Sequence, residues 1–170
     1  MLLDDKRGIS FLETLMVLSL ISMVLVLGYS FYAFGARIFA IGESQTNMQR
    51  DIRLAADFIT REVRNSRSLS LMDFLDSPIK ENFYYIYLEH NCIKHIDQDG
   101  MESRKTDAVI EELIFELKEV PEANNRVLLR FKITGKDGEQ DYILESEVLL
   151  NNISSLSPIS DMSVVRYKKS

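Results

Sequence analysis

The chain has little cysteine, histidine or proline, and no tryptophan. Its 170 residues include one Cys, two His and three Pro. A single thiol, Cys92, cannot form an intrachain disulfide, and it leaves too few sulfur ligands for a structural zinc or iron–sulfur site. The formal net charge of −6 argues against a dedicated nucleic-acid binder, which normally carries a basic face. The length fits one compact domain of ordinary size with an appendage.

Charge is absent from one long segment, residues 14–36. A run of 23 uncharged, mostly apolar residues can cross a bilayer as a helix. Lys6 and Arg7 precede it, so we expect a cytoplasmic N-terminus, an extracytoplasmic C-terminal domain and a single membrane pass. Four aromatic residues near its C-terminal end suit the level of the membrane interface: Tyr29, Phe31, Tyr32 and Phe34.

Two residues beside this segment, Gly8 and Glu13, are explained neither by a plain anchor nor by a secretory signal. A secretory signal has a shorter apolar core followed by a small-residue cleavage site. An ionised carboxylate in hydrocarbon costs several kcal/mol and therefore needs a cationic partner. Cleavage between Gly8 and Ile9 would create an amine about 6 Å of helix rise from Glu13. That amine, or the amine of a neighbouring subunit, would supply the positive charge.

The stretch Lys6–Glu13, KRGISFLE, followed by the apolar run, resembles the class III signal of type IV pilins and type II secretion pseudopilins. The resemblance implies that a prepilin peptidase cuts after Gly8 and N-methylates Ile9, and that Glu13 guides docking into a filament. It implies other pilin subunits, the membrane and the pilus assembly machinery as partners, and no cofactor. Ile9 departs from the Phe or Met that is common at the first mature position, and Ser10 stands where Thr is common.

The helical pattern continues beyond the apolar run. We therefore assign residues 1–8 to a leader, 9–36 to a transmembrane and filament-core helix, and 37–67 to an amphipathic half of the same helix. Charged residues with both signs interleaved cover its other side, which favours a solvated face over DNA contact. The range 50–69 resembles the stalk of PilW-like minor pilins and GspJ-like minor pseudopilins. One apolar stripe should face the rest of the chain: Ile41, Met48, Ile52, Ala55, Ile59 and Val63.

A change to period-two alternation indicates β-structure after a connector over 68–82. We expect an antiparallel sheet of four or five strands over 83–170, with one face on the helix, which gives an α+β fold. The first hairpin should turn at residues 89–91, and later turns at 124–125 and 135–138. The range 106–112 fits either a helix or a strand. The strands show alternating apolar positions: Leu113, Phe115 and Leu117; Val127, Leu129, Phe131 and Ile133; Tyr142, Leu144, Val148 and Leu150.

Three groups of residues suggest other chemistry. His90, Cys92 and His95 are close in sequence, but a half-buried Cys between two polar turn histidines fits better than a metal site, so we assign no metal. The range 97–102, DQDGME, resembles the opening of a calcium loop but lacks its distal Glu, which leaves calcium binding open beside a plain surface turn. Residues 166–170 suggest a solvated tail. No phosphate loop or catalytic triad can be found, so we expect no enzyme.

These patterns together predict a structural minor pilin or pseudopilin subunit of a type IV pilus, competence or type II secretion filament, processed by prepilin peptidase and assembled through its N-terminal helix. The lone Cys excludes the C-terminal disulfide that is frequent in the family. The alternative from another class is a non-polymerising, membrane-anchored ectodomain that binds a ligand or calcium.

Overall fold

The computed structural model describes residues 10–120, 126–138, 140–153 and 159–169, apart from the side chains of residues 119 and 120. Within these residues one helix, α1 (Phe11–Arg64), is followed by nine strands. The chain divides into two units, residues 1–43 and 44–170. The expected long helix is confirmed, and its predicted length differs from the observed one by only a few residues at each end.

The strands of the second unit form two antiparallel sheets. The five-stranded sheet has the order β1-β9-β2-β3-β4, and the four-stranded sheet has the order β7-β6-β5-β8. The α+β class is confirmed, but the strands are divided between two sheets instead of forming the single sheet of four or five strands that we expected. The strand bounds are β1 Ser66–Met72, β2 Tyr84–Glu89, β3 Cys92–Ile96, β4 Glu102–Arg104, β5 Ile110–Val120, β6 Arg126–Asp137, β7 Gln140–Leu149, β8 Ile159–Met162 and β9 Val164–Lys169.

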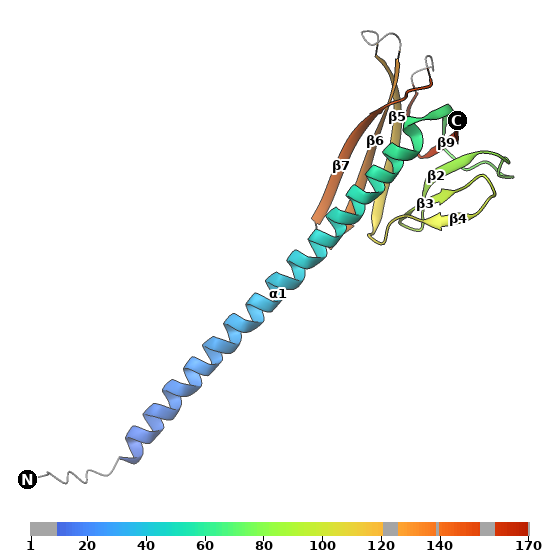
Figure 1. Ribbon diagram of the computed structural model, residues 1–170. Helices are drawn as coiled ribbons and strands as arrows, with labels where there is room; N and C mark the ends of the chain where they lie inside the picture. Colours follow the sequence, from blue (N-terminus) through green and yellow to red (C-terminus); the bar gives the residue numbers. More distant parts are fainter. Residues whose placement is uncertain (1–9, 121–125, 139, 154–158, 170) are drawn as a thin grey trace, which may run out of the picture. The chain divides into compact units, whose positions relative to one another are not determined.

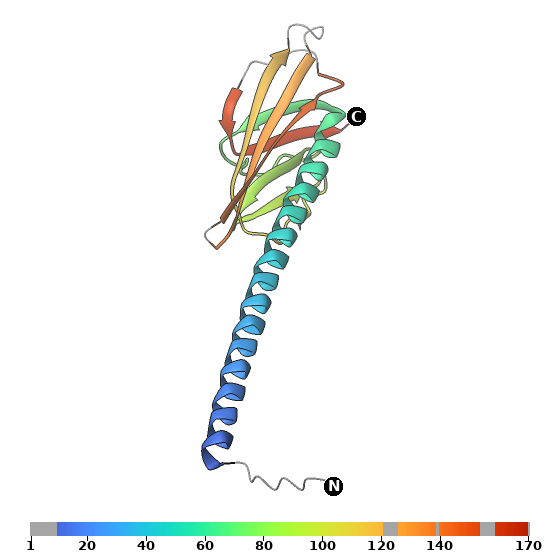
Figure 2. The ribbon, with the colours of Figure 1, turned by 90° about the vertical axis from the view of Figure 1, so that its left-hand side faces the viewer.

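The last turns of α1 lie against both sheets and complete one shared core (Figures 1 and 2). The predicted stripe is buried from Met48 onward, whereas Ile41 remains 47% exposed. The alternating residues of β5 and β6 are buried as predicted, because every second side chain of a strand points to the same face. The core combines residues of α1 with inward-facing residues of the strands, including Ile52, Ile59, Val63, Leu69, Ile86, Phe115, Leu129, Phe131 and Val165.

Four of the described strands, β1, β4, β8 and β9, occupy ranges for which we predicted no strand, and two of them replace a predicted connector and a predicted tail. β1 fills the first part of the predicted connector and pairs with β9. β9 in turn occupies the range that we interpreted as a solvated tail, where it lies between β1 and β2. Tyr167 in this strand is fully buried. Its charged neighbours face the other side of the sheet, where Arg166 forms an ion pair with Asp76 at 2.7 Å.

The turns follow from local backbone chemistry. His90 and Asn91 both have positive φ, 49° and 58°, as a two-residue hairpin turn between β2 and β3 requires. In the β6–β7 hairpin the strand extends through Gly135, so the positive-φ glycine is Gly138, three residues later than the start of the predicted turn. The ambiguous range 106–112 is not helical. Residues 106–109 form a loop and residues 110–112 are the start of β5, where Ile110 N donates to Asn91 O at 2.8 Å.

Candidate assembly site on the N-terminal helix

The first unit presents a helix whose apolar side chains are exposed all round. Between Phe11 and Phe34 every large apolar side chain is at least 48% exposed. Even at about 1 kcal/mol per side chain, leaving these residues in water would cost on the order of 20 kcal/mol, more than the whole stability of an ordinary domain. The exposed side chains are Phe11, Leu12, Leu15, Met16, Val17, Leu18, Leu20, Ile21, Met23, Val24, Leu25, Val26, Leu27, Tyr29, Phe31, Tyr32 and Phe34.

The polar side chains of this segment find hydrogen-bond partners within the helix. The hydroxyl of Thr14 donates to Phe11 O at 2.7 Å, and the hydroxyls of Ser19, Ser22 and Ser30 donate to carbonyls three or four residues earlier, each at 2.8 Å. Such bonds remove the cost of placing a hydroxyl in hydrocarbon. By length and composition α1 can therefore cross a membrane.

Glu13 is the acidic residue of the first turn of α1. The turn is closed by Ser10 O, which accepts from Glu13 N at 2.9 Å and from Thr14 N at 3.2 Å. Within the described part of the chain, the Glu13 carboxylate has no ion-pair partner. The free N–H groups at a helix start favour a negative charge nearby. The other two predicted site residues, Gly8 and Ile9, lie outside the described residues.

A polar cluster joins the second half of α1 to the five-stranded sheet. The carboxylate of Glu62 accepts from the hydroxyl of Tyr167 and forms an ion pair with Lys169 at 2.9 Å. His95 Nε2 lies 3.1 Å from the hydroxyl oxygen of Tyr167, and its ring stands edge-on to Phe58. The cluster therefore connects α1, β3 and β9.

Burial and neighbouring charges set the ionisation of this cluster. Burial lowers the pKa of His95 below its ordinary value, and Lys105 and Lys169 act in the same direction against the opposing effect of Glu62. Burial would raise the pKa of Glu62, but the hydrogen bonds from Tyr167 and Lys169 outweigh it and bring the net pKa below the usual one. At neutral pH the helix is thus attached through a neutral histidine and a charged carboxylate.

The residues considered as metal ligands are not brought together. The His90 side chain is 83% exposed, whereas Cys92 is buried with its thiol 3.2 Å from Glu89 O. His95 is 7% exposed, so it belongs to the core and not to a polar turn as we expected. No group of three or more His, Cys, Asp or Glu side chains with metal-binding geometry occurs among the described residues.

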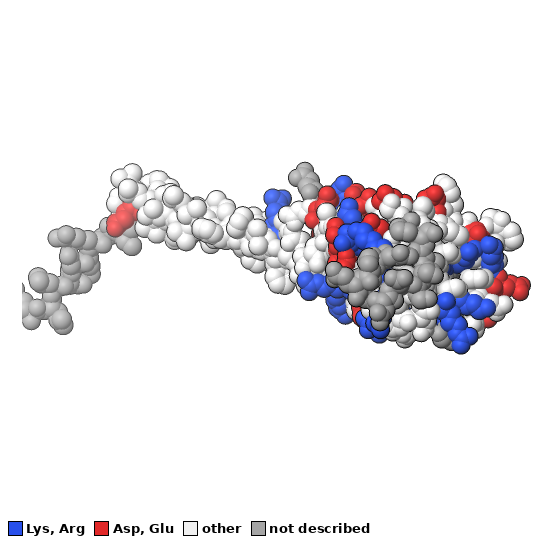
Figure 3. Space-filling model, turned by 90° about the horizontal axis from the view of Figure 1, so that it is seen from above, with Lys and Arg blue, Asp and Glu red and all other residues white. Residues whose placement is uncertain are grey.

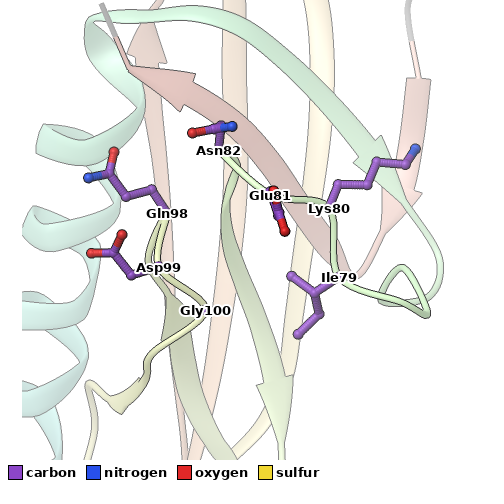
Figure 4. A pocket seen from close by; sticks show the side chains of 7 residues that line it. All are labelled: Ile79, Lys80, Glu81, Asn82, Gln98, Asp99 and Gly100. Atoms are coloured by element: carbon purple, nitrogen blue, oxygen red, sulfur yellow. The ribbon is translucent and has the colours of Figure 1, made fainter.

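Two carboxylates of the calcium-like range, those of Asp97 and Glu102, are used within the protein. Asp97 Oδ1 accepts from the backbone N–H of Asp99 at 3.0 Å and of Met101 at 2.8 Å. Glu102 forms an ion pair with Lys94 and accepts from the Tyr87 hydroxyl. A pocket of about 410 Å³ lies beside this turn, with residues 98–100 on one side and 79–82 on the other (Figure 4).

The sequence matches no protein-family model and no curated protein. Two solved structures are similar to the chain: the PilB minor pilin from Streptococcus sanguinis, with a TM-score of 0.54, and its D319A mutant, with a TM-score of 0.53. The fold is that of a minor pilin. Each match has 16% sequence identity and covers 74% of this chain but only 35% of the other. The similarity thus concerns the long helix with its β-sheets. The larger part of the PilB chain has no counterpart in this chain.

Proposed function

We propose that this chain is a structural subunit of a type IV pilus-like filament, in which the apolar part of α1 packs against the helices of neighbouring subunits. One observation carries the proposal: on a minor-pilin fold, an exposed apolar helix has a carboxylate in its first turn. Before assembly the same segment would hold the precursor in the membrane. Packing in a helix bundle would replace the apolar burial that is lost when the subunit leaves the bilayer.

We further propose that the precursor is cut between Gly8 and Ile9 by a prepilin peptidase. The motif spacing supports this, because it places the new amine of Ile9, which is then N-methylated, about 6 Å of helix rise from Glu13. The carboxylate would pair with this amine or with that of a neighbouring subunit. A misplaced neighbour would leave Glu13 buried and unpaired, which costs several kcal/mol and so selects one register.

Mass spectrometry of the protein from its own cells tests the processing step. We expect a chain that begins at N-methylated Ile9 in cells with the peptidase, and a chain that retains residues 1–8 in cells without it. Retention of these residues in both would contradict the proposal. It would favour the alternative, a non-polymerising membrane-anchored ectodomain that binds a ligand or calcium.

Substitution of the carboxylate tests the assembly step. Glu13→Ala should leave the second unit folded but remove the subunit from sheared filaments, as followed by immunoblot against the membrane fraction. Glu43→Ala is the matched control, because Glu43 is an exposed carboxylate on the same helix outside the apolar run. Equal incorporation of the two variants would rule out the role of Glu13.

A further inference from the structure

The side of α1 that faces away from the core carries a basic stripe. At 100° per residue, the stripe residues fall within an arc of roughly 100° opposite the buried positions. All of them are exposed, and Asp57 forms an ion pair with Arg61 at 2.9 Å. In the described part of the chain, the guanidinium groups of the other three arginines make no ion pair. The stripe, called here the arginine face, consists of Arg50, Arg53, Leu54, Asp57, Arg61 and Arg64.

An acidic row lies on β7, the edge strand of the four-stranded sheet. The exposed residues Asp141, Ile143, Glu145 and Glu147 alternate with inward-facing ones, so they share one face. We call them the β7 face. In Figure 3 acidic side chains, mixed with basic ones, gather along one side of the second unit, and basic side chains predominate along the opposite side.

The bases opposite β7 neutralise this row only in part, although Lys132 attracts Glu145 and Lys136 attracts Asp141. Lys136 and Lys132 of β6 stand in register with Asp141 and Glu145. Both lysines, however, make ion pairs on their other side, each at 2.8 Å, with Glu111 and Glu112 respectively. Within the row, Glu147 has a close in-chain partner, Arg130. The β7 face therefore keeps negative charge on the side that no further strand covers.

The two faces match in length and in the position of an apolar side chain. From Arg50 to Arg64 the helix rises about 21 Å, and from Asp141 to Glu147 the strand rises about 20 Å. Each face has one exposed large aliphatic residue, Leu54 at 53% and Ile143 at 55%. A hollow of about 310 Å³, lined in part by Leu54, can receive such a side chain.

We propose that the arginine face of one subunit docks on the β7 face of a second copy of this chain, with Leu54 against Ile143 at the centre and the charges around them. An apolar centre with a charged rim is the usual arrangement of an interface. The arginine face points away from the core, so it cannot reach β7 of its own chain. A contact between two different surfaces repeats head to tail, which produces an open filament. The inference rests on the proposed function.

Charge reversal in the full chain, expressed in its own cells, tests this contact. Arg50→Glu with Arg53→Glu, or Asp141→Lys with Glu145→Lys, should each lower incorporation into filaments about tenfold through like-charge repulsion. The four substitutions together restore opposite charges and should return incorporation to near the wild-type level. Arg67→Glu with Lys168→Glu, two exposed bases on β1 and β9, is the matched control and should have little effect.

Cross-linking in purified filaments gives a second readout. A chain with Leu54→Cys and Ile143→Cys should form dimers with a short bismaleimide, whereas either substitution alone should not, because Cys92 is buried. If the wild-type subunit is absent from filaments, the proposed function itself fails. If it is present but the fourfold variant is not restored and no dimer forms, this contact alone is overturned.

Discussion

The polar cluster around Tyr167 makes a quantitative prediction for the substitution Tyr167→Phe. The hydroxyl of this fully buried residue donates its proton to Glu62. The hydroxyl oxygen of Tyr167 must therefore accept the Nε2–H of His95. The substitution removes both bonds and leaves the ring in place. One of the two bonds goes to a charged group.

A hydrogen bond to a charged group contributes about 1.5–3 kcal/mol, and a neutral one about 1 kcal/mol. Because Lys169 remains beside the carboxylate and Phe is more easily buried than Tyr, we expect a net loss of about 2 kcal/mol in the free energy of unfolding. For a unit of this size, that loss corresponds to a fall in Tm of roughly 6–12 °C.

The assay is thermal unfolding of the full chain in detergent, followed by near-ultraviolet circular dichroism. This signal reports the packing of the tyrosines, since the chain has no tryptophan. Tyr84→Phe is the matched control: its ring stacks on that of Tyr167, but its hydroxyl bonds to Gln98 in an exposed position. If the two variants lower Tm equally, the attachment of α1 through Glu62 and Tyr167 is refuted.

Two further predictions concern the same unit. The folded-state pKa values of His95 and Glu62 both lie below their ordinary values, so the unfolded chain takes up these protons first. The free energy of unfolding should therefore fall as pH drops below about 6.5, and again below about 4.5, and urea titrations of wild type and His95→Gln should differ in the first step. Gly135→Val should cost about 1–3 kcal/mol, because a Cβ at this position would overlap the buried Ile52 side chain. Urea unfolding of Gly138→Ala, where φ is +63° but the space is open, separates backbone strain from this overlap.

The sequence predicts the elements whose signal is local. The 3.6-residue stripe that ends at Val63 predicts the second half of α1, and strict alternation predicts β5, β6 and β7. These patterns are sufficient to predict the elements, because the spacing of apolar residues within each one identifies its buried face. The Lys6–Glu13 motif likewise indicates Glu13 directly, but the spatial relation of Gly8 and Ile9 to it stays a prediction.

The elements that the sequence does not predict depend on partners far along the chain. The sequence of β9 alone resembles a solvated basic tail. Its burial depends on Glu62, 105 residues earlier, which accepts the hydrogen bond of the Tyr167 hydroxyl. Arg166 in the same strand needs Asp76, 90 residues away, on the other face of the sheet. His95 looks like a polar turn residue for the same reason. Neither periodicity nor charge can show such pairings.

The position of β9 also bears on the order of folding. β1 comes directly after α1, but among the described strands it pairs with β9 alone, and the register joins Leu69 to Tyr167. The loop between them is long, so this pairing is entropically slow to form. In the topology expected from the sequence, the N-terminus stays in the cytoplasm and the second unit is translocated from residue 44 onward, so β1 must wait for residues 164–169 before it has a neighbour. Until then the buried face of the second half of α1 lacks part of the sheet that packs against it. A chaperone or the bilayer surface could bind the second unit in this partly folded state.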